Sequence, residues 1–193
     1  MSNYINYGRL STFDTVKELA LSEDFSRSTL RELTDSQKHT RVSIGLFNIL
    51  DGMEGYANSN MFFKYHELLE DVVSAVKERY GYSNITYNSL MVVKLIPNGV
   101  ISTHIDEYGR YAVSHRIHIP IKTNSECIFN IDGEIKHLEE GSIVEIDNMK
   151  PHSVVNGDED RIHLIVDISE SNDTEYEFDK YVISNKIPEY FYT

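Results

Sequence analysis

The sequence lacks several features, and each absence narrows the range of functions. It contains a single cysteine, Cys127, so no disulfide can form within the chain, and a reducing compartment is expected. Cys127 itself is expected to be a small buried apolar residue. No segment approaches the ~18 uninterrupted apolar residues of a membrane-spanning helix, and the first residues show no basic region followed by an apolar core. We therefore expect a soluble, cytoplasmic protein without a membrane partner.

Positive charge is also scarce, with 18 lysines and arginines against 31 acidic residues and a formal net charge of −13. This excess of acid argues against a phosphate backbone as the main partner, so nucleic acid is not expected. Any anion that the protein does bind must be met by local cations. Glycine and proline form no clusters and no repeat is visible, so we expect a single domain over residues 1–193.

Periodicity predicts helices and a strand in residues 1–85, which we expect to support the rest of the fold. The expected elements are a helix at 12–21 opened by the capping-box spacing Ser11–Asp14, a strand at 40–50 closed by Asp51-Gly52, and one long helix at 61–80 stopped by Gly81. The last segment, 171–193, is acidic and rich in tyrosine. It is either a flap that closes over the site or a packed tail.

Residues 86–170 are predicted to be almost wholly β. The expected strands are 88–96, 114–122, 127–131, 134–138, 142–146, 152–155 and 161–168, with a hairpin turn at Asp132-Gly133. Short strands at this spacing predict a mainly β fold with flanking helices, either a sandwich or a barrel. A double-stranded β-helix, the cupin-like jelly roll, is the version whose mouth holds a small ligand, so we expect the jelly-roll core and its site in this region.

The motif His104-Ile-Asp106 is the candidate centre of the chain. In an extended segment residues two apart project to the same face, so this imidazole and this carboxylate can bind one ion. His152, in a turn followed by a short strand, is a third candidate ligand. Two histidines and one carboxylate with open coordination positions suit a non-haem Fe(II) oxygenase. A lone His-x-Asp pair also arises by chance in a chain with 8 histidines and 31 acidic residues.

Two predicted strands repeat a pattern of arginine and histidine, Arg116-Ile-His118 and Arg161-Ile-His163. Alternation places the charged and polar residues on one face of each strand and the isoleucines on the other. A buried arginine needs an anion, and its planar fork matches a carboxylate, so a dicarboxylate cosubstrate would satisfy both arginines. The alternative is that both arginines face solvent beside acidic partners. Arg161 and His152 can face one cavity from adjacent antiparallel strands.

From Leu95 to Ile168 the chain resembles the aspartyl/asparaginyl β-hydroxylase family of Fe(II)- and 2-oxoglutarate-dependent oxygenases. The matching motifs are His104-x-Asp106, Arg116-Ile-His118-Ile-Pro120, Gly141 before an acidic strand, Pro151-His152-x-Val154-x-Asn156 and Arg161-x-x-Leu164-Ile-Val-Asp167-Ile168. The resemblance implies a double-stranded β-helix with the iron ligands His104, Asp106 and His152. It also implies that Arg161 pairs with the distal carboxylate of 2-oxoglutarate, and that Arg116 and His118 contact this cosubstrate near the metal.

The activity implied by the resemblance is hydroxylation of a C–H bond of an amino acid, free or within a peptide, with release of succinate and carbon dioxide. Fe(II), 2-oxoglutarate and dioxygen would be its cofactors, and a small molecule or a peptide its partner. One alternative is a cupin-like metal enzyme without 2-oxoglutarate, which gives no reason for a buried Arg161. The other is a non-catalytic β-sandwich that binds a peptide or sugar. His163 is expected to be either a core histidine or a supporting group beside the site.

Overall fold

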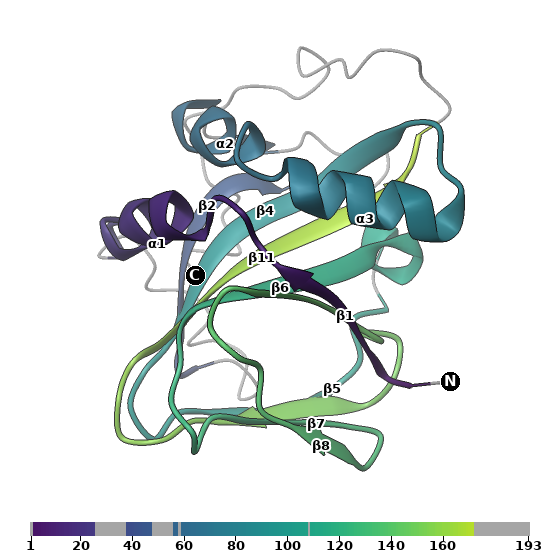
Figure 1. The fold of residues 1–193 in the computed structure, drawn as a ribbon. Coiled ribbons are helices and arrows are strands. Elements are labelled where there is room, and N and C mark those ends of the chain that lie inside the picture. The colour runs from purple at the N-terminus through teal and green to yellow at the C-terminus, as the bar shows by residue number, and fades with distance from the viewer. Residues whose placement is uncertain (1, 26–37, 48–55, 58, 108, 172–193) are drawn as a thin grey trace.

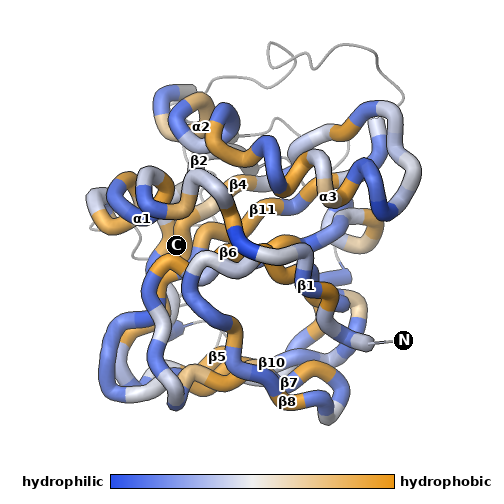
Figure 2. The backbone as a smooth tube through the Cα atoms, viewed as in Figure 1, coloured by the Kyte–Doolittle hydropathy of each residue, from blue (hydrophilic) through white to orange (hydrophobic). Residues whose placement is uncertain are grey.

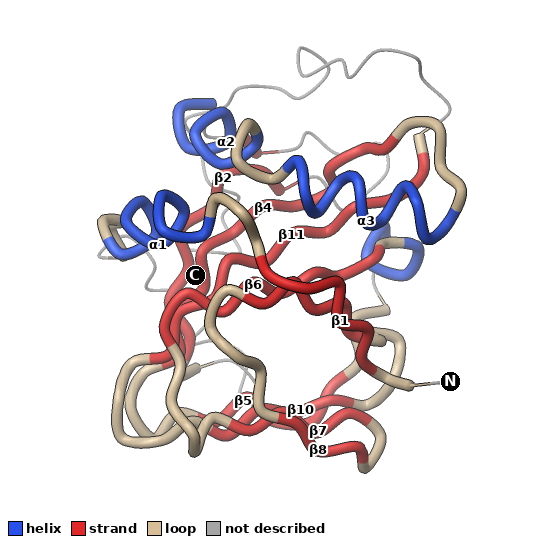
Figure 3. The backbone as a smooth tube through the Cα atoms, in the orientation of Figure 1, coloured by secondary structure: helices blue, strands red, loops and turns tan. Residues whose placement is uncertain are grey.

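The computed structural model describes residues 2–25, 38–47, 56–57, 59–107 and 109–171. In this part of the chain two β-sheets lie face to face, and three helices cover the outer face of the larger sheet (Figure 1). Figure 3 shows that the helices lie on that side alone, so the smaller sheet has no helical cover among the described residues.

The larger sheet has the strand order β1-β9-β6-β11-β4-β2-β3, and the smaller sheet has the order β5-β10-β7-β8. The strand bounds are β1 Tyr4–Arg9, β2 Thr40–Phe47, β3 Tyr56–Ala57, β4 Ile85–Leu95, β5 Val100–His104, β6 His115–Lys122, β7 Ile128–Ile131, β8 Glu134–Lys136, β9 Ser142–Ile146, β10 His152–Val155 and β11 Arg161–Glu170. All of these pairings are antiparallel. From β4 onward the chain passes back and forth between the sheets, which is the winding of the double-stranded β-helix expected from the sequence.

The helices differ from the prediction in their number, because two helices replace the single helix expected at 61–80. They are α1 Phe13–Leu21, α2 Ser59–His66 and α3 Glu70–Tyr80, with a 3-10 turn at Gly109–Val113. The single long helix predicted at 61–80 is therefore wrong, because the chain turns between His66 and Glu70. The hydroxyl of Thr12 donates to the carbonyl of Leu68 at 2.7 Å, and the carboxylate of Asp71 accepts from the backbone of Ser11 at 2.6 Å. The start of α1 therefore supplies hydrogen-bond donors to the Leu68 carbonyl and the Asp71 carboxylate, which lie at and just after the turn between α2 and α3.

The N-terminus of α1 also differs in its capping. Thr12 is the residue at the N-cap, and no side-chain capping bond is formed there because its hydroxyl binds Leu68 instead. At the end of α3, Gly81 has a φ of 73°, the left-handed conformation that terminates a helix at low cost for glycine. The predicted stop at Gly81 is confirmed, and the predicted capping box is wrong.

The main core lies between the helices and the larger sheet. The alternation predicted for β6 and β11 is confirmed, because Ile117, Ile119, Ile162 and Leu164 all belong to this core. The helices contribute apolar side chains opposite them, among them Phe13, Val16, Phe62, Val72 and Val76. Figure 2 shows apolar segments along β6 and β11 and alternating polar and apolar segments along α3. Each fully buried aliphatic side chain of this kind stabilises the fold by about 1.5–3 kcal/mol.

A smaller core lies between the two sheets and includes Leu95, Cys127, Phe129 and Ile146. The predicted burial of Cys127 is confirmed, since its exposed fraction is 1%. The hairpin predicted at Asp132-Gly133 joins β7 to β8, and both residues have positive φ. None of the helices in the described ranges has the length and hydropathy needed to span a bilayer.

Three of the observed strands, β1, β3 and β5, are absent from the predicted strands. In β1 the alternation is weak, because the polar Asn6 and Gly8, with a φ of 107°, interrupt it. Pairing with β9 forms this strand despite the weak local pattern. The last part of the predicted strand 40–50, the turn at Asp51-Gly52 and nearly all of the predicted tail at 171–193 lie outside the described residues. The division of the chain into a support, a core and a tail stays a prediction.

A candidate metal centre and anion pocket

The pairing register of the smaller sheet brings two histidines together. His104 ends β5, His152 begins β10, and the two residues are direct partners in the antiparallel ladder. Their ring centroids are 4.2 Å apart. Each Nδ1 lies within hydrogen-bond distance of a backbone carbonyl, that of Ser102 at 2.8 Å for His104 and that of Lys150 at 2.9 Å for His152. A carbonyl only accepts, so each Nδ1 carries the proton and each Nε2 offers a lone pair, the state in which imidazole binds a metal.

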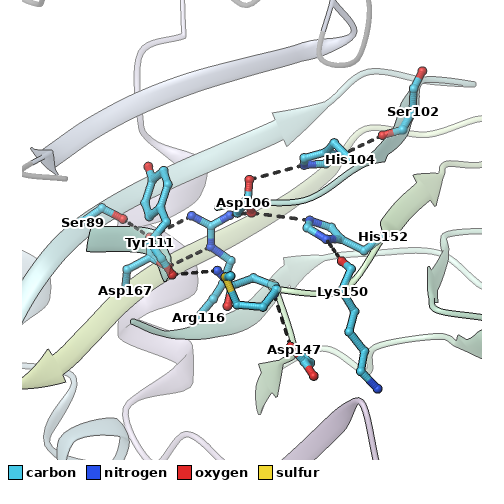
Figure 4. Close-up of polar contacts among 12 residues, drawn as sticks. Ser89, Ser102, His104, Asp106, Tyr111, Arg116, Asp147, Lys150, His152 and Asp167 are labelled. Carbon is cyan, nitrogen blue, oxygen red and sulfur yellow. Dashed lines mark hydrogen bonds and ion pairs between the residues drawn. The ribbon is translucent and has the colours of Figure 1, made fainter. Parts of the chain in front are cut away.

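Asp106 completes this group, as Figure 4 shows. Its backbone N–H donates to the carbonyl of Asn148 at 3.1 Å, which ties the loop after β5 to the loop before β10. One carboxylate oxygen lies 3.6 Å from Nε2 of His104, and the other lies 3.5 Å from Nε2 of His152. One ligand atom from each of these three residues lies within 4.8 Å of the others. We name His104, Asp106 and His152 the His-Asp-His cluster.

The charge state of the His-Asp-His cluster suits a divalent cation. Burial by itself would raise the pKa of Asp106, but the positive charge of Arg116 holds it well below its usual range. Burial lowers the pKa of His104, and the neighbouring His152 lowers it further. A charged carboxylate beside neutral imidazoles is the form in which these groups bind metal, and this donor set fits Fe(II).

Arg161 lies in the same cavity as the two cluster histidines, a space of about 50 Å³. Its exposed fraction is 1%, and its Nε has no hydrogen-bond partner. The ring of Phe129 lies 5.1 Å from its guanidinium carbon. Burial lowers the pKa of Arg161 to about 10, so the group stays charged at neutral pH. Within the described residues no carboxylate forms an ion pair with Arg161, so the cavity holds a buried cation that lacks an anion.

Two further histidines line the region around Arg161. Nδ1 of His118 lies 3.1 Å from Nδ1 of His163, and both Nε2 atoms are buried without a partner. Burial lowers the pKa of both rings well below the usual value, and the charge of Arg161 adds to this effect. His163 is fully buried and contacts Arg161, so its position fits both roles expected from the sequence. His118 lines the cavity, and its expected contact with the cosubstrate stays a prediction.

Arg116 also lines the cavity and is 8% exposed. The alternative in which Arg116 and Arg161 face solvent is therefore wrong. The guanidinium of Arg116 donates from Nε to Asp167 Oδ1 at 2.8 Å and from Nη2 to Asp167 Oδ2 at 3.1 Å. From Nη1 it donates to Oδ2 of Asp106. Its expected contact with the cosubstrate stays a prediction.

The sequence reasoning gave no role to Asp167, Ser89 or Phe129, which all lie around the arginines. Asp167 had a usable signal, because it lies an even number of residues after Arg161 on one strand and so shares its face. Ser89 and Phe129 had none, since each stands on a different strand from both arginines. Their positions depend on the order of the strands in the sheets.

The sequence profile described as aspartyl/asparaginyl beta-hydroxylase matches residues 50–171. A search of curated proteins finds no match.

Several solved structures share the fold. An oxidoreductase of the 2OG-Fe(II) oxygenase family from Burkholderia pseudomallei has a TM-score of 0.67 at 12% identity, covering 83% of this chain and 78% of that chain. HygX from Streptomyces hygroscopicus, with nickel, 2-oxoglutarate and hygromycin B bound, has a TM-score of 0.58 at 8% identity, covering 91% and 86%. A Trichoplax adhaerens prolyl hydroxylase in complex with a hypoxia inducible factor peptide fragment has a TM-score of 0.54 at 12% identity, covering 87% and 84%. These likenesses confirm the double-stranded β-helix.

Proposed function

The chain belongs to the aspartyl/asparaginyl β-hydroxylase family, and from this premise we propose that its His-Asp-His cluster holds Fe(II) and its Arg161 binds 2-oxoglutarate. Family membership makes the chain an enzyme, a hydroxylase that uses Fe(II), 2-oxoglutarate and dioxygen. When bound, the iron activates dioxygen while 2-oxoglutarate is oxidised to succinate and carbon dioxide, and one oxygen atom enters a C–H bond of the substrate.

The metal would be held by Nε2 of His104, Nε2 of His152 and one carboxylate oxygen of Asp106. The two backbone carbonyls that accept from the Nδ1 atoms fix the tautomer and the orientation of each ring. Three protein ligands leave coordination positions open, which the cosubstrate and dioxygen require. The protein's contribution is to hold these three groups in place before the metal arrives.

The observation that carries the cosubstrate assignment is the unpaired charge of Arg161. A buried guanidinium without an anion is unfavourable, and its planar fork matches a carboxylate with two parallel hydrogen bonds. Arg161 shares one cavity with the two cluster histidines. A dicarboxylate that reaches the metal at one end can therefore meet Arg161 at the other. A cupin-like enzyme without 2-oxoglutarate would leave this cation without a partner.

The walls of the cavity would exclude water from the bound cosubstrate. They include the apolar side chains of Val93, Phe129, Val154 and Ile165. An apolar wall lowers the local dielectric, so each hydrogen bond from Arg161 to a carboxylate becomes stronger. The same wall favours the neutral form of His118, whose pKa is already lowered by burial.

The substrate would lie in a second hollow of about 620 Å³. Ile146 lines both spaces. The walls of the second hollow include Tyr4, Tyr80, Met149 and the exposed Arg79, which makes no ion pair with a carboxylate in the described part of the chain. We propose that an amino acid, free or within a peptide, enters here with an anionic group toward Arg79. A cytoplasmic location stays a prediction.

A binding experiment tests the assignment of the site. The purified protein is loaded anaerobically with Fe(II) and then with 2-oxoglutarate, and a weak visible charge-transfer band is expected when both bind together. His104→Ala should form no band even after both additions. Arg161→Ala should form no band at 2-oxoglutarate concentrations that saturate the wild type. If the wild type binds Fe(II) but forms no band, 2-oxoglutarate is excluded as the cosubstrate and the cupin-like alternative is favoured.

A turnover experiment then identifies the substrate. Amino acids and short peptides are screened for substrate-stimulated succinate formation, and the product mass shows whether one oxygen atom has been added. Succinate formation without product oxidation would contradict the proposed hydroxylation.

A further inference from the structure

A row of buried polar side chains crosses the larger sheet and ends at the His-Asp-His cluster. Ser89 on β4, Asp167 on β11 and Arg116 on β6 are direct partners across three neighbouring strands. Ser89 and Asp167 have an exposed fraction of 0%, and Arg116 has 8%. The hydroxyl of Ser89 donates to Asp167, Asp167 accepts twice from Arg116, and Arg116 donates to Asp106 (Figure 4). The row therefore connects the centre of the sheet to a candidate metal ligand.

Arg116 has little freedom to move within this row. Two of its nitrogens are held by Asp167 at 2.8 and 3.1 Å, which is the forked geometry that suits a guanidinium and a carboxylate. The ring of Tyr111 covers its face, with the guanidinium carbon 4.4 Å from the ring centroid. Nη1, which does not contact Asp167, donates to Asp106. The position of that nitrogen is therefore set by Asp167 and not by Asp106.

The charges of the row matter for a cation. Asp106 and Asp167 carry two negative charges, and Arg116 carries one positive charge between them. With Asp167 present, Arg116 is already neutralised and Asp106 keeps a net negative charge to offer a metal. Without the charge of Asp167, Arg116 would be balanced by Asp106 alone, and a divalent cation would have to compete with it.

We propose that Asp167 is a positioning residue for the metal, acting through Arg116 to fix one oxygen of Asp106 and to leave the carboxylate's charge available to the cation. The proposal rests on the proposed function, because it needs the His-Asp-His cluster to hold the ion. Ser89 lies on the side of Asp167 opposite Arg116, and its hydroxyl donates to Oδ2 of Asp167. This hydrogen bond holds the Asp167 carboxylate in place. Asp167 does not itself line the cosubstrate cavity, and it reaches Asp106 through Arg116.

The test measures Mn(II) affinity in the absence of 2-oxoglutarate, by the electron paramagnetic resonance signal of free Mn(II). Asp167→Asn keeps the shape of the side chain and removes its charge. Groups that orient metal ligands contribute about 10- to 100-fold to metal affinity, so Asp167→Asn should bind Mn(II) at least ~10-fold more weakly. In an Asp106→Ala background the same substitution should change the affinity less than ~2-fold, because the two residues act through one path.

A matched control separates this role from a general effect of losing a buried carboxylate. Glu145 is also buried, and it accepts hydrogen bonds from Tyr80 and His115 outside the cluster. Glu145→Gln should leave Mn(II) affinity within ~2-fold of the wild type, and both variants are checked for folding by circular dichroism. If Asp167→Asn does not fold, Ser89→Ala takes its place, with a smaller expected loss of ~3-fold in the same direction.

The outcomes are distinct. Wild-type affinity in Asp167→Asn, or in Ser89→Ala where Asp167→Asn does not fold, would overturn the positioning role and leave the cluster assignment intact. An equal loss in the Asp106→Ala background would also overturn it, because Asp167 would then act by another path. If His104→Ala binds Mn(II) as the wild type does, the cluster is not the metal site and both proposals fail.

Discussion

Arg161 and His163 point into one space from the same strand, and Nη2 of Arg161 donates to Nδ1 of His163 at 2.6 Å. The imidazole accepts this bond, so His163 is neutral with its proton on Nε2. Nδ1 of His118 lies 3.1 Å from the same acceptor atom. A neutral ring therefore orients the guanidinium without cancelling its charge. This arrangement leaves Arg161 ready for an external anion.

Substitution of Arg161 should weaken 2-oxoglutarate binding in a graded way. Arg161→Lys keeps the charge and loses the two-bond geometry, whereas Arg161→Ala loses both. Removing one member of a desolvated charge pair costs about 2–5 kcal/mol, so Arg161→Ala should bind at least ~30-fold more weakly. Calorimetry on the Mn(II)-loaded protein measures this.

The control for Arg161 is Arg9→Ala, an exposed arginine at the end of β1 that donates to the carbonyl of Glu140. It should bind 2-oxoglutarate as the wild type does. Mn(II) affinity should change little in all three variants, because Arg161 would meet the far end of the cosubstrate. Binding by Arg161→Ala within about threefold of the wild type, against the loss expected for a charge pair, would exclude Arg161 as the anchor.

Replacement of either cluster histidine should abolish metal binding and turnover. His104→Ala and His152→Ala each remove one Nε2 donor, and the expected loss of Mn(II) affinity is at least ~100-fold, more than for a group that only orients a ligand. His137→Ala is the matched control, since its Nδ1 bonds the carbonyl of Cys127 away from the cavity. Retention of full metal content in either cluster variant would remove that residue from the ligand set.

Asp106→Ala and Asp106→Gly should both be severe. Each leaves only two neutral imidazoles for the cation and removes the negative charge of the carboxylate, so Mn(II) affinity and succinate formation should fall together. The backbone bond from residue 106 to Asn148 is kept in both variants, so the loop need not move. Normal iron affinity and rate in Asp106→Gly would show that the carboxylate is not a required ligand.

The stability of the protein should depend on Glu145 in a pH-dependent way. Burial alone would raise the pKa of Glu145, but hydrogen bonds from His115, Tyr7 and Tyr80 bring it below its usual 4.5. A depressed pKa means that the folded state binds fewer protons, so Glu145 stabilises the fold above pH 4.5 and this contribution is lost as the pH falls through the folded-state value.

Glu145→Gln should therefore lower the free energy of unfolding by about 1–2 kcal/mol at pH 7, and the difference from the wild type should shrink in acid. Urea denaturation at a series of pH values measures both. A difference that stays constant down to the acid limit would show that the carboxylate's charge does not contribute.

The sequence alone determined the elements whose signal is local. Alternation in Arg116–Ile121 and Arg161–Val166 predicts both the strands and the face on which each arginine lies, because side chains in a strand alternate by geometry. The motif His104-x-Asp106 and the later His152 predict the ligand types. The structure brings these three residues together as the resemblance implied.

Only the tertiary structure decided how distant segments meet. The predicted helix at 61–80 breaks between His66 and Glu70, where Thr12 binds the carbonyl of Leu68, and nothing near that position in the sequence signals the contact. The row from Ser89 through Asp167 and Arg116 depends on β4, β11 and β6 being neighbours in that register. Strand order and register are properties of the assembled sheets, so a carboxylate in an apolar strand reveals its partner only after the fold has formed.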